Sequence, residues 1–416
     1  MRLDATALHL FLAIAPAMLA PVAGAETYTF EPGDEWAKIG PKLVAGDEVV
    51  LLEGTHVPAQ FENLAGEPGK PIVIRASEKT PLAEIAARRE GLRLTNCRHI
   101  RIERLLVKGA RRAGIVIDSI GSARSEDIAI HDSVVAGVSG LVEQSGILVI
   151  STDGIDIRRT RIENCAGSMI RFENSSSITC ERLQLRTIDA ARCATALLFL
   201  GDIDKVDVND AIVSGQFETG LSLGANDAPR APREVRDPVP LKPNAPRPDS
   251  GTPPNAEPTG VQPSAIEPRR VLFSNGTFTN LLLSGCDRAI EVGSSDSALI
   301  TATTVIDPIE EVVRLVAPSE GKAPPSLRFR ENIVVWRPRG LRRFVDAPEG
   351  LDCSKLVFGP NIWWSKELPD ALPLLGPTEN PFVGTLDTPQ TTTLDPALDT
   401  GGRPATEDAK LFGRNL

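Results

Sequence analysis

Short runs of alternating apolar and polar residues recur along this chain at nearly constant spacing, and this repeat constrains the fold more than any other feature. We expect the first inward-facing position of each run at residues 100, 128, 155, 178, 206, 271, 299, 327 and 355. The steps between these positions are 28, 27, 23, 28, 65, 28, 28 and 28 residues. A repeat of about 28 residues with strand-like alternation predicts equivalent units stacked along one axis.

Each repeat carries more than one strand-like run. A second run lies late in most repeats, as at 114–117 and 146–149, and a third short apolar piece lies between the two, as at 105–107. Three short strands joined by polar or glycine-containing bends make one coil of a β-solenoid, with one set of side chains inward and the other in solvent. The sequence therefore predicts an all-β protein, in which only residues 81–89 look helical.

The one outsized step contains residues 226–268, which hold twelve prolines among polar and charged residues. Such a composition predicts a disordered or polyproline-like loop. Because the repeat resumes afterwards, we interpret the segment as an insertion in one coil; a linker between domains is the alternative.

Residues 1–25 resemble a signal peptide. Arg2 precedes a largely apolar stretch at 8–19, and Ala23-Gly24-Ala25 forms a small-x-small cleavage site. A membrane anchor is the alternative, but the apolar stretch is short for a bilayer span. We therefore expect cleavage after Ala25 and a secreted or periplasmic protein with no membrane span.

The remaining chain divides into three parts. Residues 26–97 would form an N-terminal cap and the first coils, 98–365 the solenoid, and 366–416 a C-terminal extension or cap. The formal net charge of −10 argues against a nucleic-acid-binding protein, and we expect a monomer. Six cysteines without metal-like spacing are interpreted as small buried core residues; export would also permit disulfides.

Three stretches carry a resemblance to a known family. Residues 46–55 (GDEVVLLEGT) and 66–76 (GEPGKPIVIRA) resemble the start of chondroitinase-B-like and alginate-lyase β-helix proteins. Residues 361–364 (NIWW), followed by 380–383 and 394–401, resemble the closing coil of many secreted β-helix proteins. The resemblance implies a single-stranded right-handed parallel β-helix of the pectate-lyase-like kind and an acidic, uronate-containing polysaccharide as ligand.

The catalytic coil of those lyases has its nearest counterpart at residues 164–175. Glu173 stands where the resemblance would place a catalytic lysine, while Ala166 and Ser168 stand where it would place Ca²⁺-binding carboxylates. The following coil lacks the expected arginine. The standard lyase constellation is therefore absent, so the resemblance specifies the fold better than the activity.

Arg171 and Glu173 remain as candidate catalytic residues. Both should face solvent, because they alternate with the apolar Ile170 and Phe172. An arginine could hold a substrate carboxylate, and a glutamate could act as acid or base. The alternative is a charge pair on a solvated sheet.

Asp202, Asp204 and Asp207 are candidate ligands for Ca²⁺, which needs several converging oxygens. Turn residues are the alternative, and no cofactor is otherwise indicated. The histidines His56, His99 and His131 lack ligand spacing and are interpreted as structural.

Two basic stretches, 88–112 and 322–343, could hold a polyanionic glycan. Arg101, Arg328 and Arg330 are the candidate substrate-binding residues within them, and solvated faces without a ligand are the alternative. Trp363 and Trp364 could stack against sugars or form a hydrophobic end cap. Two functions follow as hypotheses: a polysaccharide lyase or related enzyme, and a non-catalytic secreted or cell-surface protein that binds glycan or has a structural role.

Overall fold

The computed structural model describes most of the chain after the predicted signal peptide. The described residues are 24–77, 83–139, 144–188, 192–224, 272–337, 341, 343–365, 367–368, 395–400, 402–406 and 409–413. Nearly all of the predicted signal peptide and the whole of the proline-rich segment 226–268 lie outside them, so both remain predictions. Among the described residues, no helix is long and apolar enough to cross a bilayer.

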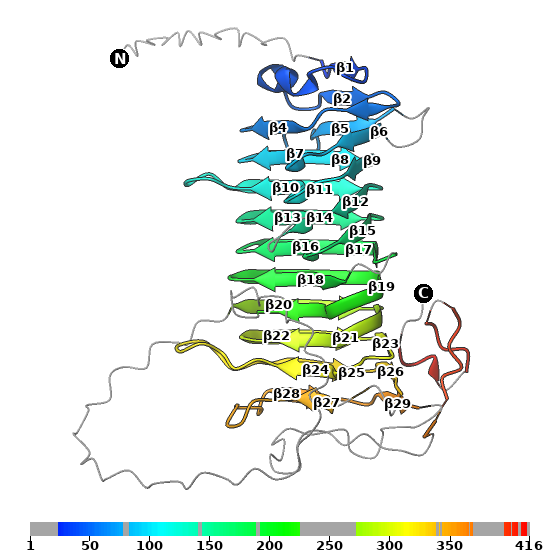
Figure 1. Ribbon diagram of the computed structural model, residues 1–416. Coiled ribbons are helices and arrows are strands. Elements are labelled where there is room, and N and C mark those ends of the chain that lie inside the picture. The colour runs from blue at the N-terminus through cyan, green and yellow to red at the C-terminus, as the bar shows by residue number, and fades with distance from the viewer. Residues whose placement is uncertain are drawn as a thin grey trace, which may run out of the picture.

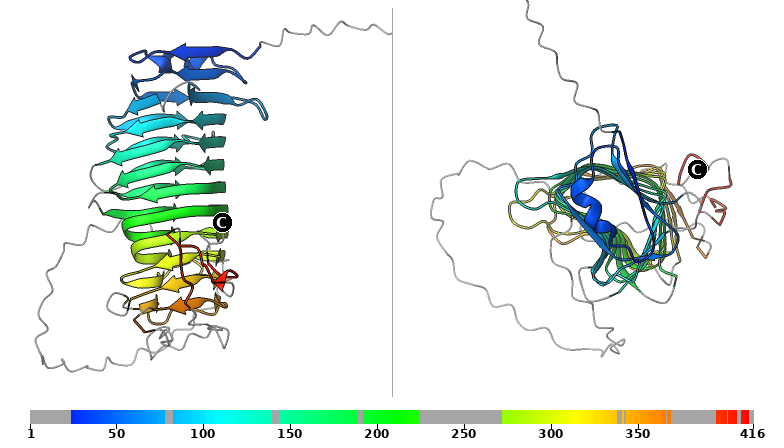
Figure 2. Two further views of the ribbon diagram at one scale, coloured as in Figure 1. Left: turned by 90° about the vertical axis from the view of Figure 1, so that its right-hand side faces the viewer. Right: turned by 90° about the horizontal axis from the view of Figure 1, so that it is seen from above.

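The predicted right-handed parallel β-helix is confirmed (Figure 1). Strands from successive coils pair in parallel and build three faces around one axis (Figure 2). Three long strands turn corners and so contribute to more than one face: β17 (Ser176–Arg186), β19 (Ile203–Leu223) and β21 (Leu282–Val292).

The first face consists of the strands that open each coil. Its members, besides the first parts of β17 and β19, are β1 (Thr27–Phe30), β2 (Glu48–Leu51), β5 (Ile72–Ala76), β8 (Arg98–Glu103), β11 (Ser125–His131), β14 (Thr152–Arg158), β20 (Phe273–Thr279), β22 (Ser295–Thr301), β25 (Leu327–Arg330) and β28 (Leu356–Phe358).

The second and third faces follow in each coil. The second face contains β3 (Thr55–His56), β6 (Ala83–Ala86), β9 (Leu105–Lys108), β12 (Val134–Val138), β15 (Arg161–Cys165), β23 (Thr304–Ile306), β26 (Ile333–Val335) and β29 (Ile362–Trp364), with parts of β17, β19 and β21. The third face contains β4 (Ala59–Glu62), β7 (Glu90–Thr95), β10 (Ala113–Asp118), β13 (Ser145–Ile150), β16 (Ser168–Glu173), β18 (Cys193–Leu200), β24 (Glu311–Leu315) and β27 (Arg343–Asp346), with the ends of β19 and β21.

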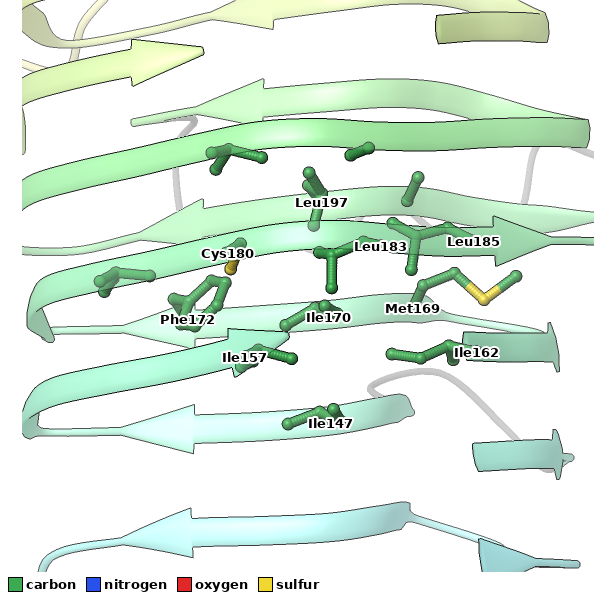
Figure 3. Close-up of a cluster of buried hydrophobic side chains, with 14 of the residues drawn as sticks. Ile147, Ile157, Ile162, Met169, Ile170, Phe172, Cys180, Leu183, Leu185 and Leu197 are labelled. Carbon is green, nitrogen blue, oxygen red and sulfur yellow. The ribbon is translucent and has the colours of Figure 1, made fainter. Parts of the chain in front are cut away.

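The core is one continuous column of side chains along the axis (Figure 3). Ile100, Ile128, Ile155, Ile178 and Val206 stack in successive coils, as the repeat predicted. Isoleucine and valine suit this position because β-branched side chains pack well on a pleated surface.

The predicted series is wrong at three later positions. The pairing places Gly276, Ala298 and Leu356 in the inward column, where the prediction had residues 271, 299 and 355; residue 271 itself lies outside the described residues. At two of these positions the error is a single residue, which moves every side chain to the opposite side of the strand. Glycine and alanine at positions 276 and 298 removed the apolar signal on which the prediction depended, whereas Leu356 carries that signal and was misplaced by one residue.

The helix predicted over 81–89 is also wrong. Residues Ala83–Ala86 form β6, which pairs with β3 and β9, and Ala83 and Ile85 point into the core. Alanine favours a helix locally, but the neighbouring coils offer pairing partners that outweigh this weak preference. The one helical element among the described residues is the 3-10 helix η1 (Trp36–Lys42), which lies across the N-terminal end of the column (Figure 2).

Two positions in nearly every coil have a left-handed backbone. One precedes the first inward residue and is occupied by His99, Asp127, Gly154, Ser177, Lys205, Asn275 and Ser297. The other turns the chain from the first face to the second and is occupied by Arg104, Asp132, Arg159, Arg182, Asp210, Asn280, Ala302 and Glu331. We call this second set the corner column. A single left-handed residue turns the chain without lengthening the coil, at a cost of about 1–2 kcal/mol for residues other than glycine, asparagine and aspartate.

The C-terminal extension packs sideways in its described part. Ala409, Leu398 and Phe412 lie in one apolar cluster with Ile333 and Ile362, which point outward from the second face. Figure 1 shows the described part of the extension beside β26 and β29. We call residues 395–413, in their described part, the C-terminal strap. Trp363 points into the core and Trp364 packs against the same cluster, so both tryptophans serve in hydrophobic packing.

Candidate functional site

Arg171 and Glu173 lie side by side on the outer side of β16, as their alternation with Ile170 and Phe172 predicted. The Arg171 side chain is 18% exposed to solvent, and the Glu173 side chain is 24% exposed. Along the sheet, Arg171 lies between Leu148 of the preceding coil and Leu198 of the next. The charged pair is therefore flanked by apolar side chains of the neighbouring coils on the third face.

The two side chains form an ion pair between Nε of Arg171 and Oε1 of Glu173. Two residues apart on one strand, they share the same side of the pleat and meet without a change in backbone. Leucine neighbours reduce screening by water, so the pair should interact more strongly than a pair in full solvent. A guanidinium and a carboxylate at one place could hold an anion and exchange a proton.

The structure does not bring the predicted substrate-binding arginines into one site. Arg101 and Arg328 both point outward from the first face, but seven coil steps separate them, roughly 33 Å at the usual strand spacing. Arg330 lies two residues from Arg328 on the same strand, with Nε 3.9 Å from Glu331. The arginines on β8 and β25 therefore belong to separate surfaces, and neither surface lies on the third face with Arg171.

The predicted calcium ligands lie near the start of β19 and on its outer side. Asp204 accepts hydrogen bonds of 2.7 Å from both Ser274 Oγ and Asn275 Nδ2. The bond from Ser274 is the main cause that lowers the pKa of Asp204. Asp207 is exposed and pairs along the ladder with two threonines. Within the described part of the chain, no three histidine, cysteine or carboxylate side chains are placed to hold a metal ion, so the geometry adds no support for Ca²⁺ at these aspartates.

The histidines have structural partners. His99 Nδ1 lies 2.7 Å from Asp127 Oδ2, and His131 Nε2 lies 3.2 Å from Asp156 Oδ2. His56 is buried, with Nε2 2.8 Å from the carbonyl oxygen of Leu52. The first two contacts join neighbouring coils and the third is local, in agreement with the structural interpretation.

Sequence reasoning missed a groove beside the corner column. It has a volume of about 390 Å³ and lies on the second face, over the coils that contain β12, β15, β17 and β19. Its lining includes Asp132, Arg159, Arg182 and Asp210 of the corner column, together with the outward Arg161 of β15. The spacing of the corner residues repeats that of the inward series four residues earlier, which is the signal that could have identified the groove.

A second missed cluster lies on the third face near the C-terminal end. Arg288 Nη2 donates a hydrogen bond of 3.0 Å to Glu310, and Nε lies 3.3 Å from Glu311 Oε2. Burial raises the pKa of Glu311, and so does the adjacent Glu310. Burial likewise raises the pKa of Asp287, which forms an ion pair with Arg192. These partners are far apart in sequence and meet only through coil register.

Comparisons with known proteins complete the description. No family model matches the chain, and no curated protein matches it. Among solved structures, a rhamnogalacturonan lyase has a TM-score of 0.48 at 13% identity, covering 94% of this chain and 100% of its own. An alginate lyase from Paenibacillus sp. str. FPU-7 has a TM-score of 0.38 at 16% identity, covering 77% of this chain and 99% of its own.

A third similar structure is the GH136 lacto-N-biosidase from Eubacterium ramulus, with a TM-score of 0.40 at 11% identity. The match covers 81% of this chain and 67% of that protein. At these identities and TM-scores, the ligand and the chemistry of this chain have to be argued from its own residues.

Proposed function

We propose that this is a secreted protein that binds an acidic, uronate-containing polysaccharide and acts on it at Arg171 and Glu173 as a polysaccharide lyase. The observation that supports the proposal is the half-buried guanidinium–carboxylate pair on the outer side of β16. An extended glycan could lie along the third face, whose strands run through consecutive coils.

The chemistry assigns a role to each residue. Cleavage of a uronate chain by elimination requires that the sugar carboxylate be neutralised, that the proton at C5 be removed and that the leaving oxygen receive a proton. Arg171 would hold the sugar carboxylate. Glu173, released from its partner by the incoming carboxylate, would take the proton from C5 as base and give it to the leaving oxygen as the C4–O bond breaks and the C4–C5 double bond forms. Asp202, Asp204 and Asp207 stay a predicted site for Ca²⁺, outside the third face.

A non-catalytic glycan-binding protein is the second candidate function. It is favoured by the same ion pair, because Glu173 already neutralises Arg171 in the absence of substrate. In that case the pair would contribute to adhesion or to stability alone.

The test incubates the full-length secreted protein with alginate, pectate and chondroitin, with and without Ca²⁺, and follows absorbance of the unsaturated uronate and release of reducing ends. We expect activity on one polymer, a raised KM for Arg171→Gln and a lowered kcat for Glu173→Gln. Arg75→Gln is the matched control, since the Arg75 side chain is 17% exposed and forms an ion pair of 2.8 Å with Glu48 near the N-terminal end. Absence of cleavage with retained polymer binding would support the second candidate, and absence of both would exclude the proposal.

A further inference from the structure

One outward column of the second face changes character along its length. From the N-terminal side it reads Leu106, Val134, Arg161, Gln184, Ile212, Leu282, Thr304, Ile333 and Ile362, each paired to the next. The last four positions are buried, and the C-terminal strap covers them. The groove begins where that cover ends.

The strap contacts the column closely at two glycines. A Cβ at Gly402 would lie 2.6 Å from Leu282, and a Cβ at Gly413 would lie 2.5 Å from Ile333, so only glycine fits at either position. Gly413 also donates a backbone hydrogen bond of 2.8 Å to Glu331, a residue of the corner column. The described part of the strap thus covers one end of this outward column, and the groove is the open continuation of the same column over the preceding coils.

The groove has a different lining from the covered part. Three arginines and two aspartates contribute to it, with Gln184 between them and Val134 and Ile212 as apolar floor. Its volume of about 390 Å³ lies in the usual range for ligand sites. From Asp132 to Asp210 the corner column spans four coils, or about 14 Å. This is a site for an elongated, polar ligand.

The charges select an acidic ligand. Arg159 is held by Asp132 through two hydrogen bonds of 2.6 and 2.8 Å, while the Arg182 side chain is 60% exposed and lies 3.5 Å from Glu181. Arg161 forms an ion pair of 3.0 Å with Glu163, so Arg182, with the longest ion-pair distance of the three, is the guanidinium best placed to meet an incoming carboxylate. Carboxylate and amide oxygens in the same groove would accept hydrogen bonds from hydroxyl groups, so the lining fits a sugar acid better than a simple anion.

The backbone supports a ligand role for these arginines. Arg159 and Arg182 have φ angles of 49° and 55°, a left-handed conformation that is unfavourable for long side chains. At the equivalent positions, Asp132, Asp210 and Asn280 are residue types that accept it at lower cost. Arg104, at the corner before Asp132, lies outside the groove and donates a hydrogen bond of 2.9 Å to the Ala76 carbonyl, whereas Arg159 and Arg182 both line the groove.

We infer that this groove binds a short uronate-containing oligosaccharide, with Arg182 and Arg161 at its carboxylates, and that the C-terminal strap closes one end of the site. The inference rests on the proposed acidic polysaccharide and adds a binding site on a different face from Arg171. A polymer bound there would be held away from the third face, so the groove contributes affinity and not chemistry.

The test measures binding of short oligogalacturonates and oligomannuronates to the full-length protein by calorimetry at low salt. Arg182→Asn removes the guanidinium and places a residue suited to the left-handed backbone, so the variant should fold. We expect about fivefold weaker binding, the scale of one exposed charge pair. Asp132→Asn removes the charge that neutralises Arg159 and should strengthen binding by about twofold to fivefold. Arg98→Gln, an exposed arginine on the first face, is the control and should bind as the wild type does.

The outcomes separate the two proposals. Wild-type binding that Arg182→Asn and Asp132→Asn leave unchanged would overturn the groove assignment, while the acidic-polysaccharide proposal would stand. Loss of cleavage in Arg171→Gln with unchanged oligosaccharide affinity would support two separate sites. If the wild type binds none of the oligomers and cleaves none of the polymers, the proposed function fails, and the groove assignment fails with it.

Discussion

Asp132 and Arg159 occupy the same left-handed position in successive coils and meet through two hydrogen bonds, from Nε at 2.6 Å and from Nη2 at 2.8 Å. The chain brings them together because the step between the two corners is one full coil. Such a contact couples neighbouring coils at their outer edge, where no core side chain reaches.

This pair predicts a pH-dependent contribution to stability. The hydrogen bond from Arg159 is the main cause that lowers the pKa of Asp132. A lowered pKa means that the stabilisation is present above the unfolded value of about 3.9 and is lost as pH falls through the folded value. Because both side chains are more than 40% exposed, Asp132→Asn should cost only about 0.2–1 kcal/mol at pH 7.

Urea denaturation at pH 7 and at pH 2.5 measures this effect. The difference between wild type and Asp132→Asn should shrink at the lower pH, and also in 1 M salt, which screens exposed charges. A difference that stays constant across pH would show that the substitution acts through the turn and not through the ion pair.

Lys205 offers a test of backbone strain. It has a φ of 56° at the position that Asp127, Gly154 and Asn275 fill in other coils. Lys205→Asn should therefore raise stability by about 0.5–1 kcal/mol, by relieving part of the left-handed cost. Thermal unfolding measures it, with Lys355→Asn, an exposed lysine outside the left-handed set, as the control. Equal shifts in both variants would contradict the explanation.

How far the sequence predicts this fold depends on what occupies the inward column. Ile100 and Ile128 identify the inward column in the sequence, whereas Gly276 has no apolar side chain by which the column could be identified. In the folded chain the ring of Phe273 fills the space above Gly276, where a Cβ would lie 2.3 Å from Cζ. A large residue at one position can fill the space left by a small residue at a neighbouring position, so that the core volume stays constant. A search for apolar residues at a fixed position does not detect this compensation.

The candidate site was less predictable than the core for a related reason. Arg171 and Glu173 were found because two residues on one strand share a side. The contacts of Arg159 with Asp132 and of Arg288 with Glu311 can be predicted only if the length of each coil is known to within one residue. A one-residue error in register reverses the side on which a charge stands, so surface clusters require the structure even where the repeat is evident.

The cysteines predict a graded thiol reactivity. All six are free; five are buried, as the sequence interpretation had all six, and Cys353 departs from it. Burial raises the pKa of Cys97 to about 11 and that of Cys165 and Cys286 to about 12, so their thiolates are scarce at neutral pH. Cys353 is only partly buried.

Alkylation of the native protein at pH 8, followed by mass spectrometry, should modify Cys353 first and the other five only after unfolding. A Cys353→Ser variant should then show almost no labelling before denaturation. Rapid labelling of Cys193 or Cys180 in the native state would mean that the coils open locally, because both side chains are fully enclosed.

Glu311 and Glu310 give the sharpest test of electrostatics on the third face. Both carboxylates contact Arg288, but burial raises the pKa of Glu311, while Glu310 accepts a hydrogen bond of 3.0 Å from the guanidinium. A raised carboxyl pKa means that the folded state holds the proton more tightly than the unfolded chain. Stability contributed by the protonated form is therefore lost as pH rises from the unfolded value toward the folded one.

Glutamine reproduces the shape of the protonated carboxyl, so Glu311→Gln should stabilise the protein at pH 7, on the order of 1 kcal/mol, and have little effect near pH 4. Glu310→Gln should instead destabilise it at pH 7, because the hydrogen bond from Arg288 would keep an acceptor but lose the acceptor's charge, which makes it weaker. Denaturation midpoints at the two pH values measure both. The opposite result is that Glu311→Gln lowers the midpoint at pH 7 as much as Glu310→Gln does. That result would contradict the prediction, because it would show that the attraction of Glu311 to Arg288 outweighs the cost of burying its charge.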